Sequence, residues 1–500
     1  MGTSLALSTH QIVAEDSFKH ENFAQDRVLG LAATEGVGER RDDFAGSFTL
    51  QNSSYGRRVA EEKTSVIGRQ DEKERQGVAF FVLKHAASLE FFEEVFLFVK
   101  KAKISYNEAM KICYISNSRI PTEKAHGIQI MKTCEALAED GVGVELVLPS
   151  RKNRPFKGVD IFSFYDVAEN FKIKKIWSCD PTWLMRVPNG IYIKVQLLFF
   201  LFSLFIFLLY KRNKKDYIFY TRDEYLLPML LNFSRKVFWE AHSLPQNSKK
   251  YLRFWQRCAG IVAITQGLKK DLINLGMAEN KIMVAPDAVD VAKFQITNSK
   301  LQIREKLNLP VDKKIVMYTG HLYGWKGVQT LAEAAEFLDK DIIVVFVGGT
   351  DFDLDNFKNK NNKLIENGKI LLLGQRPPKE VPEFLVATDC LALPNSGKED
   401  RSEKHTSPMK LFEYMAAGKP IVASDLPSIR EVLNENNVTF FKADSADDLA
   451  EKIKQVLENQ EPAQRRATQA KEDAKNYTWQ KRVEKIISFL KNEKNNTHQT

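Results

Sequence analysis

Cysteine is scarce in this chain, and its spacing excludes two kinds of stabilising link. The five cysteines lie far apart, with no C-x-x-C pair and no histidine at the spacing of a metal ligand: Cys113, Cys134, Cys179, Cys258 and Cys390. A small zinc domain needs clustered ligands, and a disulfide framework needs paired spacings in an oxidising compartment. The sequence therefore predicts no structural zinc and a chain that works in a reducing compartment.

The first 109 residues lack the apolar patterning of the rest. Gly, Ser, Glu, Arg and Gln dominate them, and apolar residues stay scattered until residue 78. Met1 is followed by no basic region and by no small-residue cleavage site after an apolar core, so no signal peptide fits. We expect the fold to begin at Met110, with residues 1–109 a disordered extension or a stretch outside the true start.

Signatures of nucleic-acid binding are also missing, although basic residues give a formal charge of +9. Basic clusters occur at residues 151–157, 211–215 and 249–257 without a zinc finger, a basic zipper or an RNA-recognition motif. Clustered positive charge attracts anionic lipid headgroups and nucleotides. We expect partners of these two kinds and no nucleic acid.

What is present is the pattern of two α/β domains. A chain of 500 residues exceeds one hydrophobic core, and 44% apolar residues are enough to fold most of it. Short β-branched runs alternate with helical periodicity, which predicts parallel strands joined by helices. Two doubly wound domains follow, at residues 110–298 and 299–475, with a helix and tail at 476–500. We expect strands at residues 112–115, 144–147, 217–220, 237–239, 260–264 and 282–285, then at 314–319, 342–347, 370–373, 390–393 and 420–423.

One segment differs from this pattern. Residues 197–210 are apolar except for Ser203, and the sequence KRNKK follows at 211–215. Fourteen residues make a helix of about 21 Å, shorter than the roughly 30 Å hydrocarbon core of a membrane. Two interpretations stay open: a core helix, or an interfacial membrane anchor whose basic collar meets anionic headgroups. The density of phenylalanine favours the anchor.

Residues 318–327, YTGHLYGWKG, place glycines between a buried strand and an amphipathic helix. Free backbone N–H groups at a helix N-terminus bind phosphate, and Lys326 adds a full charge. Taken alone, this block is more typical of a tight turn with a solvated lysine. A second block supports the phosphate interpretation.

This second block is residues 407–424, SPMKLFEYMAAGKPIVAS. Pro408 suits the first turn of a helix that Gly418 and Pro420 end before the next strand. Glu413 is a lone carboxylate on this largely apolar helix, and its spacing suggests a face turned toward a cleft. A carboxylate there can accept two hydrogen bonds from the adjacent hydroxyls of a ribose.

From residue 111 to about 490 the chain resembles glycosyltransferase family 4, the retaining enzymes of the GT-B fold. The matching segments follow the family's order: IPTEKAHGIQ at 120–129, YTR at 220–222, EAHS at 240–243, ITQGLKKDL at 264–272, VAPDAVD at 284–290, and the two blocks above. The resemblance implies an acceptor-binding first domain, a nucleotide-sugar-binding second domain and a C-terminal helix that crosses back to the first.

The resemblance also implies roles for individual residues. Lys326 would bind the donor diphosphate in place of a metal ion, Glu413 would hold the ribose, and His242 would lie close to the transferred sugar. The family binds donor near Gly127, Gly320, His321, Gly327, Gln375, Arg376, His405, Ser407, Pro408, Met409, Lys410 and Leu411. No metal and no cofactor beyond the sugar nucleotide are expected.

Two residues depart from the family's donor-binding motifs. His321 stands where the family often has an arginine paired with the loop lysine, and His405 stands where its paired-glutamate motif has the first glutamate. We interpret both as changed sugar contacts. Asp351-Phe352-Asp353 matches the D-x-D motif of a different transferase fold, but we expect a solvated turn there.

The expected reaction is transfer of a hexosyl unit from a nucleoside-diphosphate sugar to a saccharide or lipid-linked acceptor, with retention, during glycan biosynthesis. The expected location is cytoplasmic, on the inner face of the cytoplasmic membrane. Two other classes stay open: a membrane-bound pseudo-enzyme that acts as an assembly partner, and a sugar-nucleotide epimerase.

Overall fold

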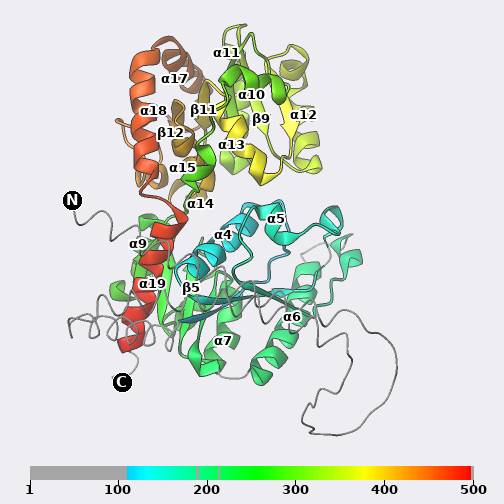
Figure 1. Cartoon of the computed structure of the whole chain (residues 1–500), viewed down its shortest axis with the longest axis vertical. Helices are drawn as coiled ribbons and strands as arrows, with labels where there is room; N and C mark the ends of the chain where they lie inside the picture. The colour runs from blue at the N-terminus through cyan, green and yellow to red at the C-terminus, as the bar shows by residue number, and fades with distance from the viewer. Residues whose placement is uncertain (1–109, 152, 187–190, 212–213, 497–500) are drawn as a thin grey trace, which may run out of the picture. The chain divides into compact units, whose positions relative to one another are not determined.

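The computed structural model describes residues 110–496 apart from 152, 187–190 and 212–213. The extension expected at residues 1–109 lies outside the described residues. The described chain forms two parallel sheets, each covered by helices on both faces (Figure 1). This is the α/β, doubly wound architecture that the alternating pattern predicts.

The first sheet has seven parallel strands in the order β3-β2-β1-β4-β5-β6-β7. Its apolar strands are buried on both faces, in two hydrophobic clusters. The strands are β1 (Lys111–Ile115), β2 (Gly143–Pro149), β3 (Lys172–Ile176), β4 (Tyr217–Thr221), β5 (Val237–Ala241), β6 (Gly260–Ala263) and β7 (Ile282–Val284). The helices are α4 (Ala125–Glu139), α5 (Ile161–Tyr165), α6 (Ile191–Tyr210), α7 (Leu227–Phe233), α8 (Ser248–Trp255) and α9 (Gln266–Asn274).

The second sheet has six parallel strands in the order β10-β9-β8-β11-β12-β13. They are β8 (Lys314–Thr319), β9 (Ile342–Val347), β10 (Ile370–Gly374), β11 (Cys390–Leu393), β12 (Ile421–Ser424) and β13 (Thr439–Phe441). The helices are α10 (Lys300–Lys306), α11 (Val328–Phe337), α12 (Asp351–Glu366), α13 (Val381–Val386), α14 (Asp400–Glu403), α15 (Met409–Ala417), α16 (Pro427–Arg430), α17 (Ala446–Glu458) and α18 (Gln460–Ala474).

In both sheets the strand order reverses beside the first strand, where β1 meets β4 and β8 meets β11. Ligands of open parallel sheets bind at this switch point, outside the carboxyl ends of the strands. The topology therefore places a crevice at each of two loops that carry motifs, after β1 and after β8.

The C-terminal helix α19 (Trp479–Asn496) packs on the first domain, against α4 (Figure 1). Its Val483, Ile486 and Leu490 belong to a hydrophobic cluster of that domain. Where the chain crosses back, Val289 donates a backbone hydrogen bond of 2.9 Å to Tyr477. The two crossings between the domains therefore run side by side.

The apolar segment forms a longer helix than its sequence run suggests. Helix α6 has 20 residues, about 30 Å at 1.5 Å per residue, so the expected 14-residue length is wrong. By length and composition this helix could cross a membrane, although 33% of its most apolar window is buried in the protein. The length of the helix was underestimated because Lys194 and Gln196 interrupt the apolar run. Gln196 is nevertheless buried, and it forms hydrogen bonds with Asn117 and Ser178.

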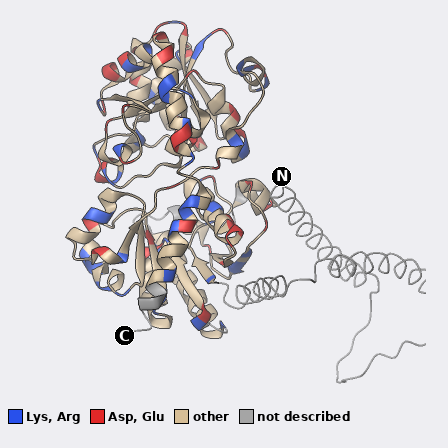
Figure 2. Ribbon diagram, turned by 60° about the vertical axis from the view of Figure 1, so that its left-hand side comes forward, with Lys and Arg blue, Asp and Glu red and all other residues tan. Residues whose placement is uncertain are grey.

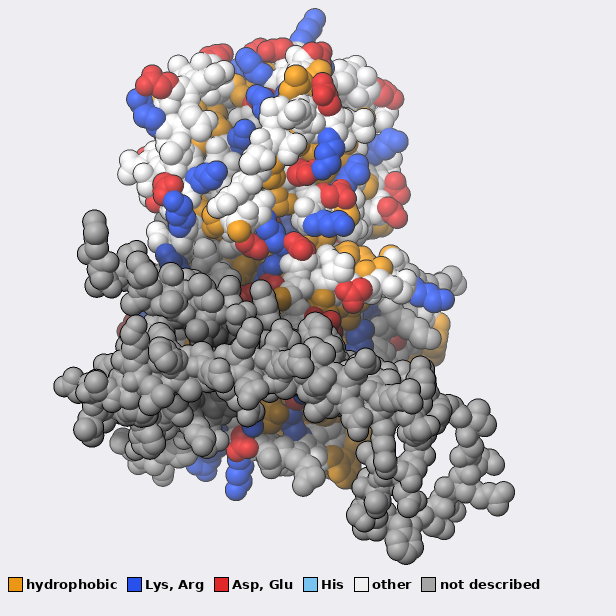
Figure 3. All heavy atoms as spheres, in the orientation of Figure 1, with side chains coloured by type: hydrophobic (Ala, Val, Ile, Leu, Met, Phe, Trp, Pro, Cys, Tyr) orange, Lys and Arg blue, Asp and Glu red, His pale blue; other side chains and the backbone are white. Residues whose placement is uncertain are grey.

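Charged side chains are mixed over the second domain. Basic and acidic residues alternate along its helices in Figure 2 and are interspersed on the face shown in Figure 3. Mixed signs of this kind are typical of a solvated surface.

Candidate functional site

One cavity of about 580 Å³ gathers most of the sequence-predicted residues. Loops after β4, β5 and β7 line one side of it, and loops after β8 and β10 line the other side with the start of α15. The predicted residues on its wall are His242, Gly320, His321, Lys326, Gln375, Arg376, His405, Ser407, Pro408, Met409, Lys410 and Glu413.

Two lysines converge beside Gly320. A Cβ at this glycine would lie 3.7 Å from the Lys410 Nζ and 3.9 Å from the Lys326 Nζ. Gly320 has φ +116°, a conformation that favours glycine, so the backbone leaves space between the two ammonium groups. Two lysine side chains around an open space can bind an anion with more than one charge when both are protonated.

Burial and neighbouring positive charges disfavour the protonated forms of the two lysines. Burial, followed by the charge of Arg401, lowers the pKa of Lys326 to about 8. Burial and the neighbouring Lys326 lower the pKa of Lys410 well below its usual range. The buried Lys410 Nζ has no hydrogen-bond acceptor among the described residues and lies 3.5 Å from the centre of the Tyr318 ring. A bound anion would relieve both effects.

Glu413 lies at the cavity wall on α15, one turn after Lys410. Burial raises the pKa of this carboxyl to about 7, although Lys410 and Lys293 act to lower it. Among the described residues none donates a hydrogen bond to the carboxylate. Both of its oxygens are therefore available to a ligand.

His321 is held by Asp353, the second acidic residue of the segment that resembles a D-x-D motif. Its Nδ1 lies 3.2 Å from the Asp353 Oδ2, and its ring stacks on Tyr323. Burial lowers the pKa of His321 below its usual value, so the ring is neutral at pH 7. The expected solvated turn is wrong: Asp351 begins α12, and Asp353 forms a capping box with Thr350.

His405 connects the two halves of the site. It is buried, and its Nε2 lies 2.8 Å from Asp271 Oδ2 on α9 of the first domain. The neighbouring Ser407 accepts a hydrogen bond of 3.0 Å from the backbone of Asp287. These contacts place the start of α15 against the first domain.

Three predicted residues do not line the cavity. Gly127 is needed for packing, because a Cβ there would lie 2.4 Å from the Tyr165 hydroxyl, and its N–H already donates to Lys124. A Cβ at Gly327 would collide with the Pro394 carbonyl at 1.6 Å. Leu411 is a core side chain whose N–H donates to Pro408. In this structure packing and backbone contacts account for these three positions, and their expected donor contacts stay predictions.

The sequence analysis missed several charged residues of the wall, among them Arg222, Asp287 and Arg401. Arg222 follows β4, Asp287 follows β7, and Arg401 lies on α14. Asp287 is buried, its Oδ1 has no donor among the described residues, and burial raises its pKa to about 7. Two of the three follow strands within segments that match the family, so strand ends alone could have identified them.

Two residues of the wall, Gln375 and Arg376, were expected to bind the donor. Gln375 and Arg376 follow β10 and are exposed at the cavity mouth. Their position at a strand end suits a flat ligand that enters from solvent.

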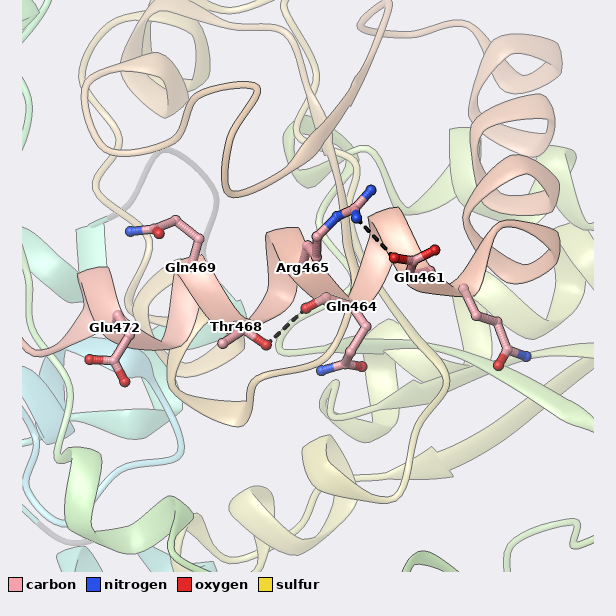
Figure 4. Close-up of a pocket in the computed structure, with 7 residues that line it drawn as sticks. Glu461, Gln464, Arg465, Thr468, Gln469 and Glu472 are labelled. Atoms are coloured by element: carbon pink, nitrogen blue, oxygen red, sulfur yellow. Dashed lines mark hydrogen bonds and ion pairs between the residues drawn. The ribbon is translucent and has the colours of Figure 1, made fainter.

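A second hollow lies along one face of α18 (Figure 4). All seven lining residues are exposed and polar, and Arg465 pairs with Glu461 of the same helix at 2.9 Å. The hollow is therefore a solvated helix face. Within the described residues no group of three His, Cys, Asp or Glu side chains is placed to hold a metal ion.

One family of known proteins matches the second domain. Residues 299–473 match the family described as glycosyl transferases group 1. An N,N'-diacetylbacillosaminyl-diphospho-undecaprenol alpha-1,3-N-acetylgalactosaminyltransferase of Campylobacter jejuni is 32% identical over 210 residues, which are 41% of this chain and 52% of that protein. The chain spans about half the length of the first curated relatives that it matches.

Longer but weaker similarities cover both domains. A D-inositol 3-phosphate glycosyltransferase of Corynebacterium glutamicum is 22% identical over 383 residues, 70% of this chain and 88% of that protein. The crystal structure of Anabaena HepE with UDP-glucose matches with a TM-score of 0.58 and 16% identity, covering 78% of this chain and 100% of HepE. This similarity shows the fold, GT-B.

Proposed function

We propose that this chain is a glycosyltransferase that moves a hexosyl unit from a nucleoside-diphosphate sugar to a hydroxyl of a saccharide or lipid-linked acceptor, with retained configuration. The observation that carries the proposal is the lysine pair around Gly320, in the domain that matches the group 1 family. The retained configuration rests on the family resemblance.

The cavity has a suitable group for each part of such a donor. Lys326 and Lys410 would hold the diphosphate and offset the charge that grows on the leaving nucleotide. Glu413 would accept hydrogen bonds from the ribose, and Gln375 with Arg376 would surround the base. His242, on the opposite wall, would face the transferred sugar.

Two relatives support the choice of substrates. The HepE structures contain UDP or UDP-glucose, and the Campylobacter jejuni relative is named for a lipid-linked diphosphate acceptor. We propose a nucleotide-sugar donor of the same class and a glycan or lipid-linked acceptor in glycan biosynthesis.

The decisive experiment incubates the purified chain with a panel of nucleotide sugars and follows release of nucleoside diphosphate and free sugar. We expect slow hydrolysis of one donor, because water replaces the acceptor. If the chain binds a donor but does not turn it over, either alone or with membranes and lipid-linked saccharide, the pseudo-enzyme that acts as an assembly partner is favoured. Conversion to an epimeric sugar nucleotide would favour the epimerase.

Binding of nucleoside diphosphate should be coupled to proton uptake. The ligand's charge raises the depressed pKa of Lys410, so this lysine gains a proton at a pH between its free and bound pKa values. Calorimetry at several pH values, in buffers of different ionisation enthalpy, measures the uptake. We expect less uptake in Lys410→Met than in the wild type; equal uptake would contradict the lysine pair.

We also propose attachment to the cytoplasmic face of the membrane through α6. Its buried residues recur every four positions, at Tyr192, Gln196, Phe200, Leu204 and Leu208. The opposite face is apolar and open, with Leu198 66%, Phe202 59% and Leu209 50% exposed. Since the inner face packs on the sheet, we place α6 flat on the membrane surface.

The surroundings of α6 fit a lipid surface better than a second copy of the chain. Trp183, 73% exposed, lies on a short helical turn that contacts α6, and Tyr210 ends the helix at 81% exposure. Lys194 and Lys215 are exposed near its two ends. Aromatic and basic side chains around an apolar face are typical of the interfacial region of an anionic membrane.

One residue of the expected basic collar has another role. Lys211 is bonded to Glu145, its side chain is only 7% exposed, and its Nζ lies 3.8 Å from the centre of the Tyr217 ring. It is therefore a structural cation that does not face headgroups. Arg212 and the side chain of Lys214 lie outside the described part of the chain.

Replacing apolar side chains on the open face of α6 with polar ones should release the protein from vesicles. In the triple variant Leu198→Gln, Phe202→Gln and Leu209→Gln, we expect the fraction that sediments with phosphatidylglycerol vesicles to fall about tenfold or more, because each apolar side chain contributes roughly 1.5–3 kcal/mol when fully buried. Donor hydrolysis in solution should be unchanged.

The matched control is the triple variant Leu301→Gln, Val311→Gln and Phe337→Gln, whose side chains are 53–54% exposed in the second domain. It should sediment like the wild type. A wild type that dimerises and never sediments would assign the face of α6 to a second copy instead.

A further inference from the structure

Glu240, on β5, is a fully buried carboxylate that four side chains hydrogen-bond at once. Gln129 Nε2 lies 2.5 Å from its Oε1, and Arg482 Nη2 lies 2.8 Å from the same oxygen. Tyr220 donates its hydroxyl to Oε2. The fourth partner is His242, whose Nε2 lies 2.8 Å from Oε1. The transfer described above gives a role to His242 but leaves Glu240 and its other three partners without one.

Arg482 brings the C-terminal helix into the cluster. It is buried on α19, and its Nε donates to the Pro286 carbonyl at 3.0 Å. Its Nη1 lies 3.4 Å from the Thr133 hydroxyl of α4. One guanidinium therefore joins α19, the loop after β7 and the carboxylate beside His242.

The cluster determines which nitrogen of His242 carries the proton. Burial acts to raise the pKa of Glu240, but Arg482 and the bonds from His242 and Tyr220 hold it below its usual range. An ionised carboxylate only accepts hydrogen bonds, so His242 Nε2 must donate. Burial, followed by Arg222, lowers the pKa of His242 to about 4, so the ring has one proton at pH 7. Its Nδ1 keeps a lone pair.

We propose that Glu240, held by Arg482, is a positioning residue that fixes His242 as a neutral imidazole protonated on Nε2, whose Nδ1 accepts a hydrogen bond from a substrate hydroxyl. His242 lines the cavity, where this acceptor meets the ligand. A carboxylate or phosphate has no proton to offer Nδ1, so this subsite takes a neutral, hydroxyl-bearing sugar. The identity of the ligand rests on the proposed transfer, whereas the protonation state does not.

Other charged groups act on the same ring. Arg222, from the loop after β4, disfavours the imidazolium form of His242. Burial and Arg222 also lower the pKa of the nearby His126 of α4, to about 3. Asp287 interacts with Arg482, Glu240 and Arg222. Arg222 and Arg482 both disfavour protonation of the His242 ring, whereas Glu240 favours it. Loss of Arg482 should therefore raise the pH at which Glu240 and His242 bind a shared proton.

The first test is the nitrogen spectrum of protein labelled with ¹⁵N-histidine, with the His242 signals identified by their loss in His242→Gln. At pH 7 we expect a proton on Nε2 and none on Nδ1. A proton on Nδ1, or on both nitrogens, would overturn the proposal. This result does not depend on glycosyltransferase activity, so the proposal and the proposed function can fail separately.

The second test is the pH profile of kcat/KM for the donor, measured throughout in the Glu413→Gln background so that the titration of Glu413 near pH 7 does not set the acid limb. In Arg482→Met we expect the acid limb to move up by about 1–3 pH units, the usual effect of an uncompensated opposite charge nearby. Arg482→Lys should partly restore it. The double variant Glu240→Gln/Arg482→Met removes both charges. The carbonyl of the introduced glutamine can still accept a hydrogen bond from His242 Nε2. The acid limb of this variant should therefore stay at low pH.

Lys485→Met is the matched control, because it removes an exposed charge from the same helix. Equal acid limbs in Arg482→Met and Lys485→Met would refute the role of Arg482. If Arg482→Met does not fold, the nitrogen spectrum and the profiles of Arg482→Lys and the double variant decide the question. A merely structural ion pair would change stability in the single variant without this pattern of pH shifts.

Discussion

In Lys326→Ala we expect turnover to fall on the order of a hundredfold or more, the scale of losing one preorganised charge contact to a leaving group. Lys326 is mostly protonated at pH 7, since its pKa of about 8 lies above that pH. A diphosphate between Lys326 and Lys410 would raise that pKa further. Steady-state release of nucleoside diphosphate measures the effect, which should appear in kcat more than in KM.

The control for this variant is Lys358→Ala, which removes an exposed lysine from α12. It should keep wild-type turnover. If Lys326→Ala also keeps it, Gly320 and its loop form an ordinary turn, and the phosphate site must lie elsewhere. A residual rate that disappears in the double variant with Lys410→Met would show that the second lysine partly replaces the first.

The strands that the sequence predicts are those buried on both faces. Strands such as β8 and β9 form continuous apolar runs and were found at nearly their observed bounds. The two missed strands, β3 and β13, lie at sheet edges. In β3 the sequence KIKKI has three lysines because most of the strand is exposed, and β13 has only three residues. An apolar-run criterion cannot detect either pattern.

The site was predictable where its residues follow strands within one motif, as Lys326 and Glu413 do. It was not predictable where distant segments meet. The packing of Gly127 against Tyr165 could not be predicted from its motif, because Tyr165 comes from another helix, 38 positions later in the chain (165 minus 127). Glu240 and Arg482 are 242 positions apart, and only the folded chain brings the C-terminal helix to that carboxylate.

The second large effect is expected in Glu413→Gln. The substitution keeps the shape of the side chain but removes a charged acceptor, so donor binding should weaken by about 1.5–3 kcal/mol, the range for a hydrogen bond to a charged group. Calorimetry with nucleoside diphosphate above pH 8 measures the loss. Glu383→Gln is the control, because that partly exposed carboxylate lies on α13 outside the cavity and pairs with Lys306.

The pH dependence of this loss gives a sharper test than its size. Because burial raises the pKa of Glu413 to about 7, the carboxyl is increasingly protonated as the pH falls below that value. Its contribution to binding as a charged acceptor is complete well above pH 7 and is lost as the pH falls through it. The difference between wild type and Glu413→Gln should therefore shrink from pH 8 to pH 6. A difference that stays constant over this interval would show that Glu413 is not titrating in the free site, and an absent difference would move the ribose contact to another residue.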